Sequence, residues 1–164
     1  MRLYIKGDYT KEIPFDYIEL AKRMWFDTKD CKPVDFSYFG NTRPFKTDPT
    51  IHLKLNKWMH DKRWNNVQLK DGIINKFRSH VYENLELDFE DNPATDYREK
   101  GDCLRLASTH LELLTVDKRA MYIMAVEVAS AIDGQISEVD KLTWIDVETF
   151  TELHKDVLSL TYDH

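Results

Sequence analysis

The segment from Asp117 to Ile132 is apolar at almost every position after Arg119. A helix that is apolar on nearly all sides has to be covered by other elements. The segment therefore predicts a helix at the centre of the domain, ended by Asp133 and by Gly134 as the left-handed residue after the helix. Its apolar positions are Ala120, Met121, Ile123, Met124, Ala125, Val126, Val128, Ala129, Ala131 and Ile132.

Most other segments alternate between apolar and polar residues, which is typical of half-buried strands. A change of phase near Ser108 and Thr109 indicates either a β-bulge in the longest of them or its division into two short strands. The predicted strands are Arg2–Lys6, 34–38, 51–55, 85–89 and a long segment from Cys103 to Val116, with a hairpin of 135–137 and 142–145.

Three further helices are expected, over 14–27, 71–82 and 147–160. Asp146 is placed to cap the last of them, whose apolar stripe runs through Phe150, Leu153 and Val157, with His154 as a packing residue beside it. Alternating strands mixed with helices predict an α+β fold with a mixed or mainly antiparallel sheet packed against three to four helices. A length of 164 residues fits a single domain, 1–164.

Several function classes are disfavoured by what the sequence lacks. It contains no apolar run of membrane-spanning length and no apolar signal-peptide core, so a cytoplasmic protein without membrane contact is expected. Cys31 and Cys103 are far apart and belong to no metal or redox motif. We find no phosphate-binding loop and no nucleophile elbow. We therefore expect no cofactor, no metal ligand and no catalytic residue, and Glu127 is expected on the exposed strip of the central helix.

Charge is distributed unevenly along the chain, whose formal net charge is −6. Residues 1–80 carry 16 Lys and Arg against 10 Asp and Glu, whereas residues 81–164 carry 7 against 19. Basic residues concentrate in 54–78 and acidic ones in 83–96. Either the two halves pair with each other in the fold, or one of them docks on a partner of opposite charge.

Docking predicts acidic residues that steer a cationic partner and aromatic or Arg side chains that anchor it. Phe39, Arg43 and Phe45 stand close together in the sequence and suit the anchoring role. The full set of predicted partner-binding residues is Phe39, Arg43, Phe45, Glu83, Glu86, Glu90, Asp91 and Asp96.

The alternative is a nucleic-acid-binding protein, or a small metal-independent nuclease, that uses the basic and aromatic segment 52–78. Its candidate residues are His52, Lys54, Trp58, His60 and Arg63. The isoelectric point near 5.5 disfavours the nucleic-acid hypothesis, because affinity for nucleic acids depends mainly on positive charges that neutralise phosphates. A small-molecule enzyme or ligand-binding domain is a third reading, which the fold class does not exclude.

One stretch carries a resemblance to a known family. The apolar helix ending in Val126–Gly134 leads into the short strand Gln135–Ser137, then into Leu142–Ile145 and an acidic helix. Over about 30 residues this resembles the C-terminal part of small bacterial immunity proteins that neutralise polymorphic toxins, many of which have Gly-Gly in place of Asp133-Gly134. The resemblance implies a cytoplasmic, non-enzymatic binding protein. Together with the charge pattern, it predicts an immunity or inhibitor-type protein that docks on a cationic protein partner.

Overall fold

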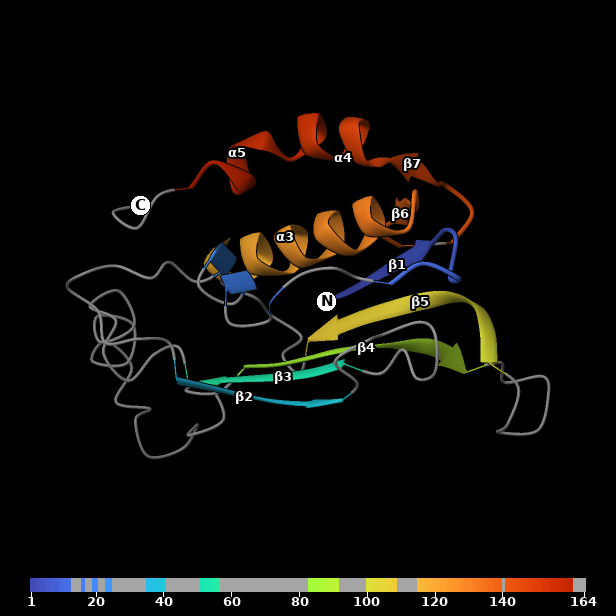
Figure 1. Cartoon of the computed structure of the whole chain (residues 1–164). Helices are drawn as coiled ribbons and strands as arrows, with labels where there is room; N and C mark the ends of the chain where they lie inside the picture. Colours follow the sequence, from blue (N-terminus) through green and yellow to red (C-terminus); the bar gives the residue numbers. More distant parts are fainter. Residues whose placement is uncertain are drawn as a thin grey trace.

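Seven antiparallel strands of the computed structural model form one sheet, in the order β2-β3-β4-β5-β1-β6-β7 (Figure 1). The structure describes residues 1–12, 16, 19–20, 23–24, 35–40, 51–56, 83–91, 100–108, 115–139 and 141–160. The predicted helix over 71–82 and most of the one over 14–27 lie outside these ranges. The strands are β1 (Arg2–Lys6), β2 (Asp35–Gly40), β3 (Ile51–Asn56), β4 (Glu83–Asp91), β5 (Lys100–Ser108), β6 (Gln135–Ser137) and β7 (Ile145–Asp146).

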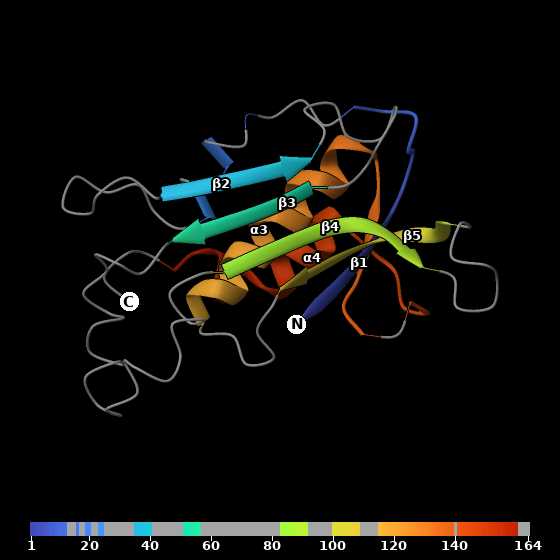
Figure 2. The ribbon, with the colours of Figure 1, turned by 90° about the horizontal axis from the view of Figure 1, so that it is seen from below.

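The named helices lie on one side of this sheet and form two layers above it. Helix α3 (Thr115–Ala131) packs against β1, β5 and β6, and α4 (Val147–Leu153) and α5 (Lys155–Leu158) pack on α3 (Figure 1). Seen from below, the strands lie in front and α3 behind them (Figure 2). The fold is α+β, as the sequence predicts.

Helix α3 is central, as its apolar sequence predicts. Two rows of apolar residues, each made of cross-strand partners in adjacent strands, lie beneath it. One row is Leu87, Leu106 and Leu3, and the other is Leu104, Ile5 and Ile136. All of these side chains are buried. The fully buried residues of α3 and its end are Ala120, Met121, Tyr122, Met124, Ala125, Val128, Ala129 and Ile132.

The prediction of an extended segment up to Val116 was wrong. Strand β5 ends at Ser108, and Thr115 and Val116 already belong to α3. Their β-branched side chains favour a strand locally, but that preference is weak and the helix overrides it. The predicted bulge or strand break near Ser108 and Thr109 extends outside the described residues. A register shift of β4 with β5 lies between Phe89 and Asp91.

The C-terminal end of α3 differs from the prediction in one residue. The left-handed position is taken by Asp133, with φ of 49°, and the Gly134 amide donates to the carbonyl of Ala129 at 2.8 Å. This is a Schellman end with Asp133, instead of Gly134, at the left-handed position. Gly134 is required for a different reason, because a Cβ there would lie 2.6 Å from the Lys6 carbonyl oxygen.

In the C-terminal helices, the predicted cap at Asp146 is confirmed, whereas the predicted apolar stripe is partly wrong. Asp146 Oδ1 accepts from the Thr149 amide at 2.7 Å. The strands β6 and β7 pair as a hairpin, but the second strand is Ile145–Asp146 and not the predicted 142–145. The helix breaks at His154, so it does not run continuously to Leu160. Leu153, predicted to lie on the buried stripe, is 66% exposed, because it comes at the end of α4, where the stripe is interrupted.

Candidate functional site

The structure places about half of the predicted binding residues. In the docking set, Phe39 lies in β2, and Glu83, Glu86, Glu90 and Asp91 lie in β4. In the nucleic-acid set, His52 and Lys54 lie in β3. The remaining predicted residues, Arg43, Phe45, Asp96, Trp58, His60 and Arg63, lie outside the described residues.

The strand register brings members of both predicted sets together. Phe39 pairs with His52, and His52 pairs with Glu86, so these three positions form one row across β2, β3 and β4. Residues directly opposite each other in adjacent strands share a face of the sheet. Phe39 and Glu86 from the docking set and His52 from the nucleic-acid set are therefore positions of the same face, which we call the polar sheet face.

Acidic and basic groups are neighbours on the polar sheet face. Glu86 Oε2 lies 3.9 Å from Arg105 Nη2 of the adjacent strand, and Asp88 is registered opposite Arg105. Glu86 and Asp88, the acidic residues of this face whose side chains the structure describes, therefore both have Arg105 as a neighbour.

A second surface lies on the outside of α4 and α5, and we call it the outer helical surface. Glu148 and Glu152 are four residues apart on α4, a spacing that places two side chains on one side of a helix. Both are exposed, as are Leu153 and Asp156, and the ammonium of Lys155 pairs with Glu152. Sequence reasoning missed this surface because it assigned Leu153 to the core. The spacing of Glu148 and Glu152 behind the Asp146 cap was the available signal.

Beneath this surface, three side chains connect the helical layers. The Tyr122 hydroxyl donates to Glu138 Oε1 at 2.6 Å, and Glu138 Oε2 lies 3.4 Å from His154 Nε2. The His154 ring packs 4.4 Å from the Tyr122 ring and 4.5 Å from that of Phe150, which confirms its predicted packing role. Burial, and then the contact with Glu138, raise the pKa of Tyr122 above its usual value. The phenol is fully buried, so this arrangement is structural.

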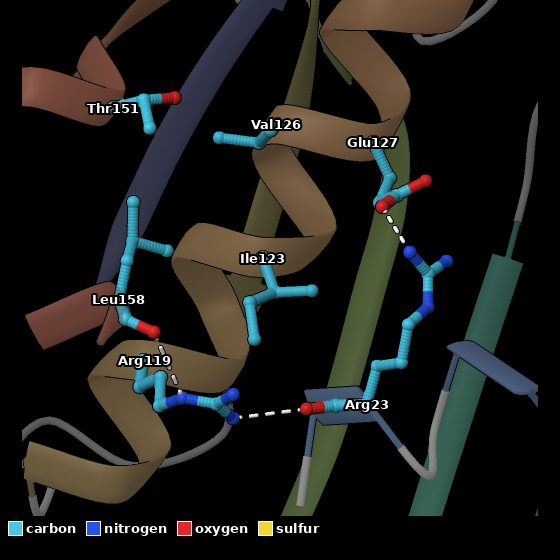
Figure 3. A pocket seen from close by; sticks show the side chains of 7 residues that line it. All are labelled: Arg23, Arg119, Ile123, Val126, Glu127, Thr151 and Leu158. Carbon is cyan, nitrogen blue, oxygen red and sulfur yellow. Dashed lines mark hydrogen bonds and ion pairs between the residues drawn. The ribbon is translucent and has the colours of Figure 1, made fainter. Parts of the chain in front are cut away.

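A cavity of about 470 Å³ opens over the partly buried strip of α3, and we call it the α3 trough (Figure 3). Ile123 and Val126 of α3 form its floor. The helices α4 and α5 contribute Thr151 and Leu158, and Arg23 stands opposite them (Figure 3). The trough therefore lies between the N-terminal segment and the C-terminal helices.

Two guanidinium groups line the α3 trough and are held differently. Arg119 Nη1 donates to the carbonyls of Arg23 and Met24 at 2.9 and 3.0 Å, and its Nε donates to the carbonyl of Leu158 at 3.3 Å. The Arg23 guanidinium forms an ion pair with Glu127 (Figure 3). Glu127, 29% exposed, thus lies on the partly exposed strip of the helix, as predicted.

Within the described ranges, no three His, Cys, Asp or Glu side chains converge as a metal site. Cys103 is buried and forms no disulfide. No helix in the same part of the chain has the length and apolar character needed to cross a membrane. Comparison with known proteins gave no match, whether to a family model, to a curated protein or to a solved structure.

Proposed function

We propose that this chain is a non-enzymatic binding protein that docks on a cationic protein domain through the outer helical surface. One observation carries the proposal. Leu153 is 66% exposed on a surface where Glu148, Glu152 and Asp156 supply carboxylates and Lys155 supplies a single ammonium. The carboxylates outnumber the ammonium of Lys155, which pairs with Glu152, so the surface carries a net negative charge.

This composition is that of a small interface. Apolar contacts at the centre of an interface hold the complex, while surrounding charges speed the encounter and select the partner. Leu153 supplies the apolar contact and the carboxylates around it attract a basic domain. The polar sheet face is less suited to this role, because Glu86 there lies near Arg105 and is registered opposite His52.

The resemblance of residues 120–150 to immunity proteins suggests which partner to test first. We propose that the partner is a toxin domain of basic composition, encoded beside this chain. The acidic excess after residue 80 supports such a partner, because binding a cationic domain relieves the repulsion between like charges. If the neighbouring gene encodes no secreted protein with a basic C-terminal domain, this choice of partner is wrong.

The decisive experiment measures association and dissociation of that domain at two salt concentrations. Reversal of Glu148 and Glu152 to Lys is expected to slow association about tenfold or more and to flatten its salt dependence. Leu153→Ser is expected to speed dissociation while leaving association nearly unchanged.

The matched control reverses the same number of charges on the polar sheet face, through Glu86→Lys and Asp88→Lys. The proposal expects this double variant to bind with rates close to those of the unmodified protein. If the sheet variant loses binding and the helical variant retains it, docking occurs on the polar sheet face. If the purified domain binds neither the unmodified protein nor any variant, the proposed function is wrong.

A further inference from the structure

The α3 trough combines an apolar lining with an excess of positive charge. Its apolar side chains are Ile123 and Val126 from α3 and Leu158 from α5. Two guanidinium groups and one carboxylate, Arg23, Arg119 and Glu127, line it as well (Figure 3). We propose that the α3 trough binds an amphipathic carboxylate, a molecule with an apolar body and a single carboxylate group.

The size and lining of the trough suit such a molecule. Ligand sites in proteins span roughly 300–1,000 Å³ and combine apolar walls with a few polar groups that set orientation. The volume of about 470 Å³ falls within this range. An alkyl or aromatic body on Ile123, Val126 and Leu158 would remove from water apolar surface that the fold leaves partly exposed.

Arg23 is the residue that would hold the carboxylate. Arg119 uses its donors on three backbone carbonyls and thereby joins the two sides of the trough. Arg23 is 51% exposed and presents a planar guanidinium with five N–H donors. It can therefore keep its contact with Glu127 and still donate to a second carboxylate. Arginine is suited to this because its donor geometry matches a carboxylate in two parallel hydrogen bonds.

The same geometry disfavours a cationic ligand. Glu127 is the one carboxylate among the described residues that line the trough, and it is paired with Arg23. A ligand ammonium would have to displace Arg23 from Glu127 and would then lie in the same cavity as two guanidinium groups. The charge of the lining therefore selects an anion, although the whole chain carries a formal net charge of −6.

The test is a titration of the full chain with sodium octanoate, followed through the ¹³C methyl signals of Ile123, Val126 and Leu158. Saturable shifts of these signals are expected. Octanamide, which has the same alkyl body without the charge, is expected to bind at least tenfold more weakly, a difference of about 1.4 kcal/mol. Octylammonium is expected to leave the trough methyls unshifted.

Two variants, Arg23→Gln and Val126→Phe, test whether octanoate binds in the trough, and Lys11→Gln is the control. Arg23→Gln is expected to weaken octanoate binding about tenfold, whereas Lys11→Gln removes the same charge from the surface pair with Asp133 and should leave binding unchanged. Val126→Phe fills the floor and should abolish the octanoate shifts without a large change in melting temperature.

Several results would overturn the proposal. The first is octanoate that shifts none of the three methyl signals. The second is octanamide or octylammonium that binds as tightly as octanoate. The third is an equal loss of binding in Arg23→Gln and Lys11→Gln, which would indicate a general effect of net charge. None of these measurements involves the protein partner, so their failure is distinguishable from failure of the proposed docking.

Discussion

The two ends of helix α3 are joined to the rest of the molecule in opposite ways. At the C-terminal end, the backbone of Gly7 and Asp8 contacts the backbone of Ile132 directly. A Cβ on Gly7 would lie 2.6 Å from the Ile132 carbonyl oxygen, and the Asp8 amide donates to that oxygen at 2.7 Å. At the N-terminal end, the side chain of Arg119 spans the distance to the carbonyls of Met24 and Leu158.

This difference explains where the molecule has room for a ligand. A junction of two glycines brings the turn after β1 and the end of α3 so close that no space remains between them. A guanidinium at the end of a long side chain holds its neighbours several ångströms from the helix axis. The α3 trough lies at this second junction, with Arg119 as part of its lining.

Of the effects expected at the two junctions of α3, the largest is at the glycine junction. Gly7→Ala and Gly134→Ala each place a methyl group 2.6 Å from a carbonyl oxygen, of Ile132 and Lys6 respectively. The backbone has to move to relieve this contact, so we expect each variant to lose about 3 kcal/mol of unfolding free energy. Chemical denaturation measures the loss, with Ser130→Ala, an exposed position of α3, as the control. A Gly134→Ala variant as stable as this control would contradict the close contact.

A smaller effect is expected at the other junction. Arg119→Lys keeps the charge but cannot direct donors at three carbonyls in the fixed geometry of a guanidinium. We expect a loss of about 2 kcal/mol, accompanied by faster amide hydrogen exchange around Met24 and Leu158. Arg23→Gln, which removes an exposed ion pair at the same trough, should cost less than about 1 kcal/mol. Equal losses in the two variants would show that Arg119 has no special joining role.

Alkaline pH should weaken the fold through Tyr9 and Tyr122. Burial raises the pKa of Tyr9, whose hydroxyl donates to Ile5 and Asp102 carbonyls, to about 12, and also raises that of Tyr122. An unfolded tyrosine titrates near 10, so above pH 10 the unfolded chain loses these protons before the folded chain does. Stability is therefore full below pH 10 and falls as pH rises toward 12.

Denaturation series between pH 9 and pH 12 test this dependence. Tyr122→Phe and Tyr9→Phe should each reduce the slope of stability against pH, because each removes a hydroxyl whose pKa is raised in the folded state. Tyr4→Phe serves as the comparison variant. If the slope is unchanged in both Tyr122→Phe and Tyr9→Phe, other groups govern the alkaline loss.

The smallest effect is expected on the outer helical surface. Leu153→Ser should change the unfolding free energy by less than about 0.5 kcal/mol, because the side chain is 66% exposed. The neighbouring Phe150→Ala, at a fully buried position, should cost about 3–5 kcal/mol. Thermal or chemical melting of the pair measures both values. A large loss in Leu153→Ser would place that residue in the core and remove the basis for the docking surface.

Several elements could be predicted from the sequence because local chemistry decides them. The apolar run after Arg119 predicted the central helix, and Asp146 predicted a helix cap that the structure contains. Strand alternation identified β1, β3 and β4 to within a few residues. The errors came where the fold overrides a local preference. Asp133 takes the left-handed position although Gly134 tolerates it better, because Gly134 is needed for the contact with Lys6.

The candidate sites were less predictable. The sequence contains no signal that Phe39, His52 and Glu86 form one row, because strand register is set by pairing between distant segments. Arg23 and Glu127 are likewise separated by 104 positions and meet only through the packing of the N-terminal segment on α3. Leu153 was assigned to the core because a continuous helix was assumed through His154.

What the sequence alone determined is which segments become helices or strands and which of their faces are apolar, since both follow from the spacing of neighbouring residues. It also determined that the second half of the chain is acidic. The tertiary structure decided which apolar side chains remain outside the core and which charges become neighbours. The α3 trough exists because two segments pack against one helix strip without closing over it, and no local pattern encodes the distance between them.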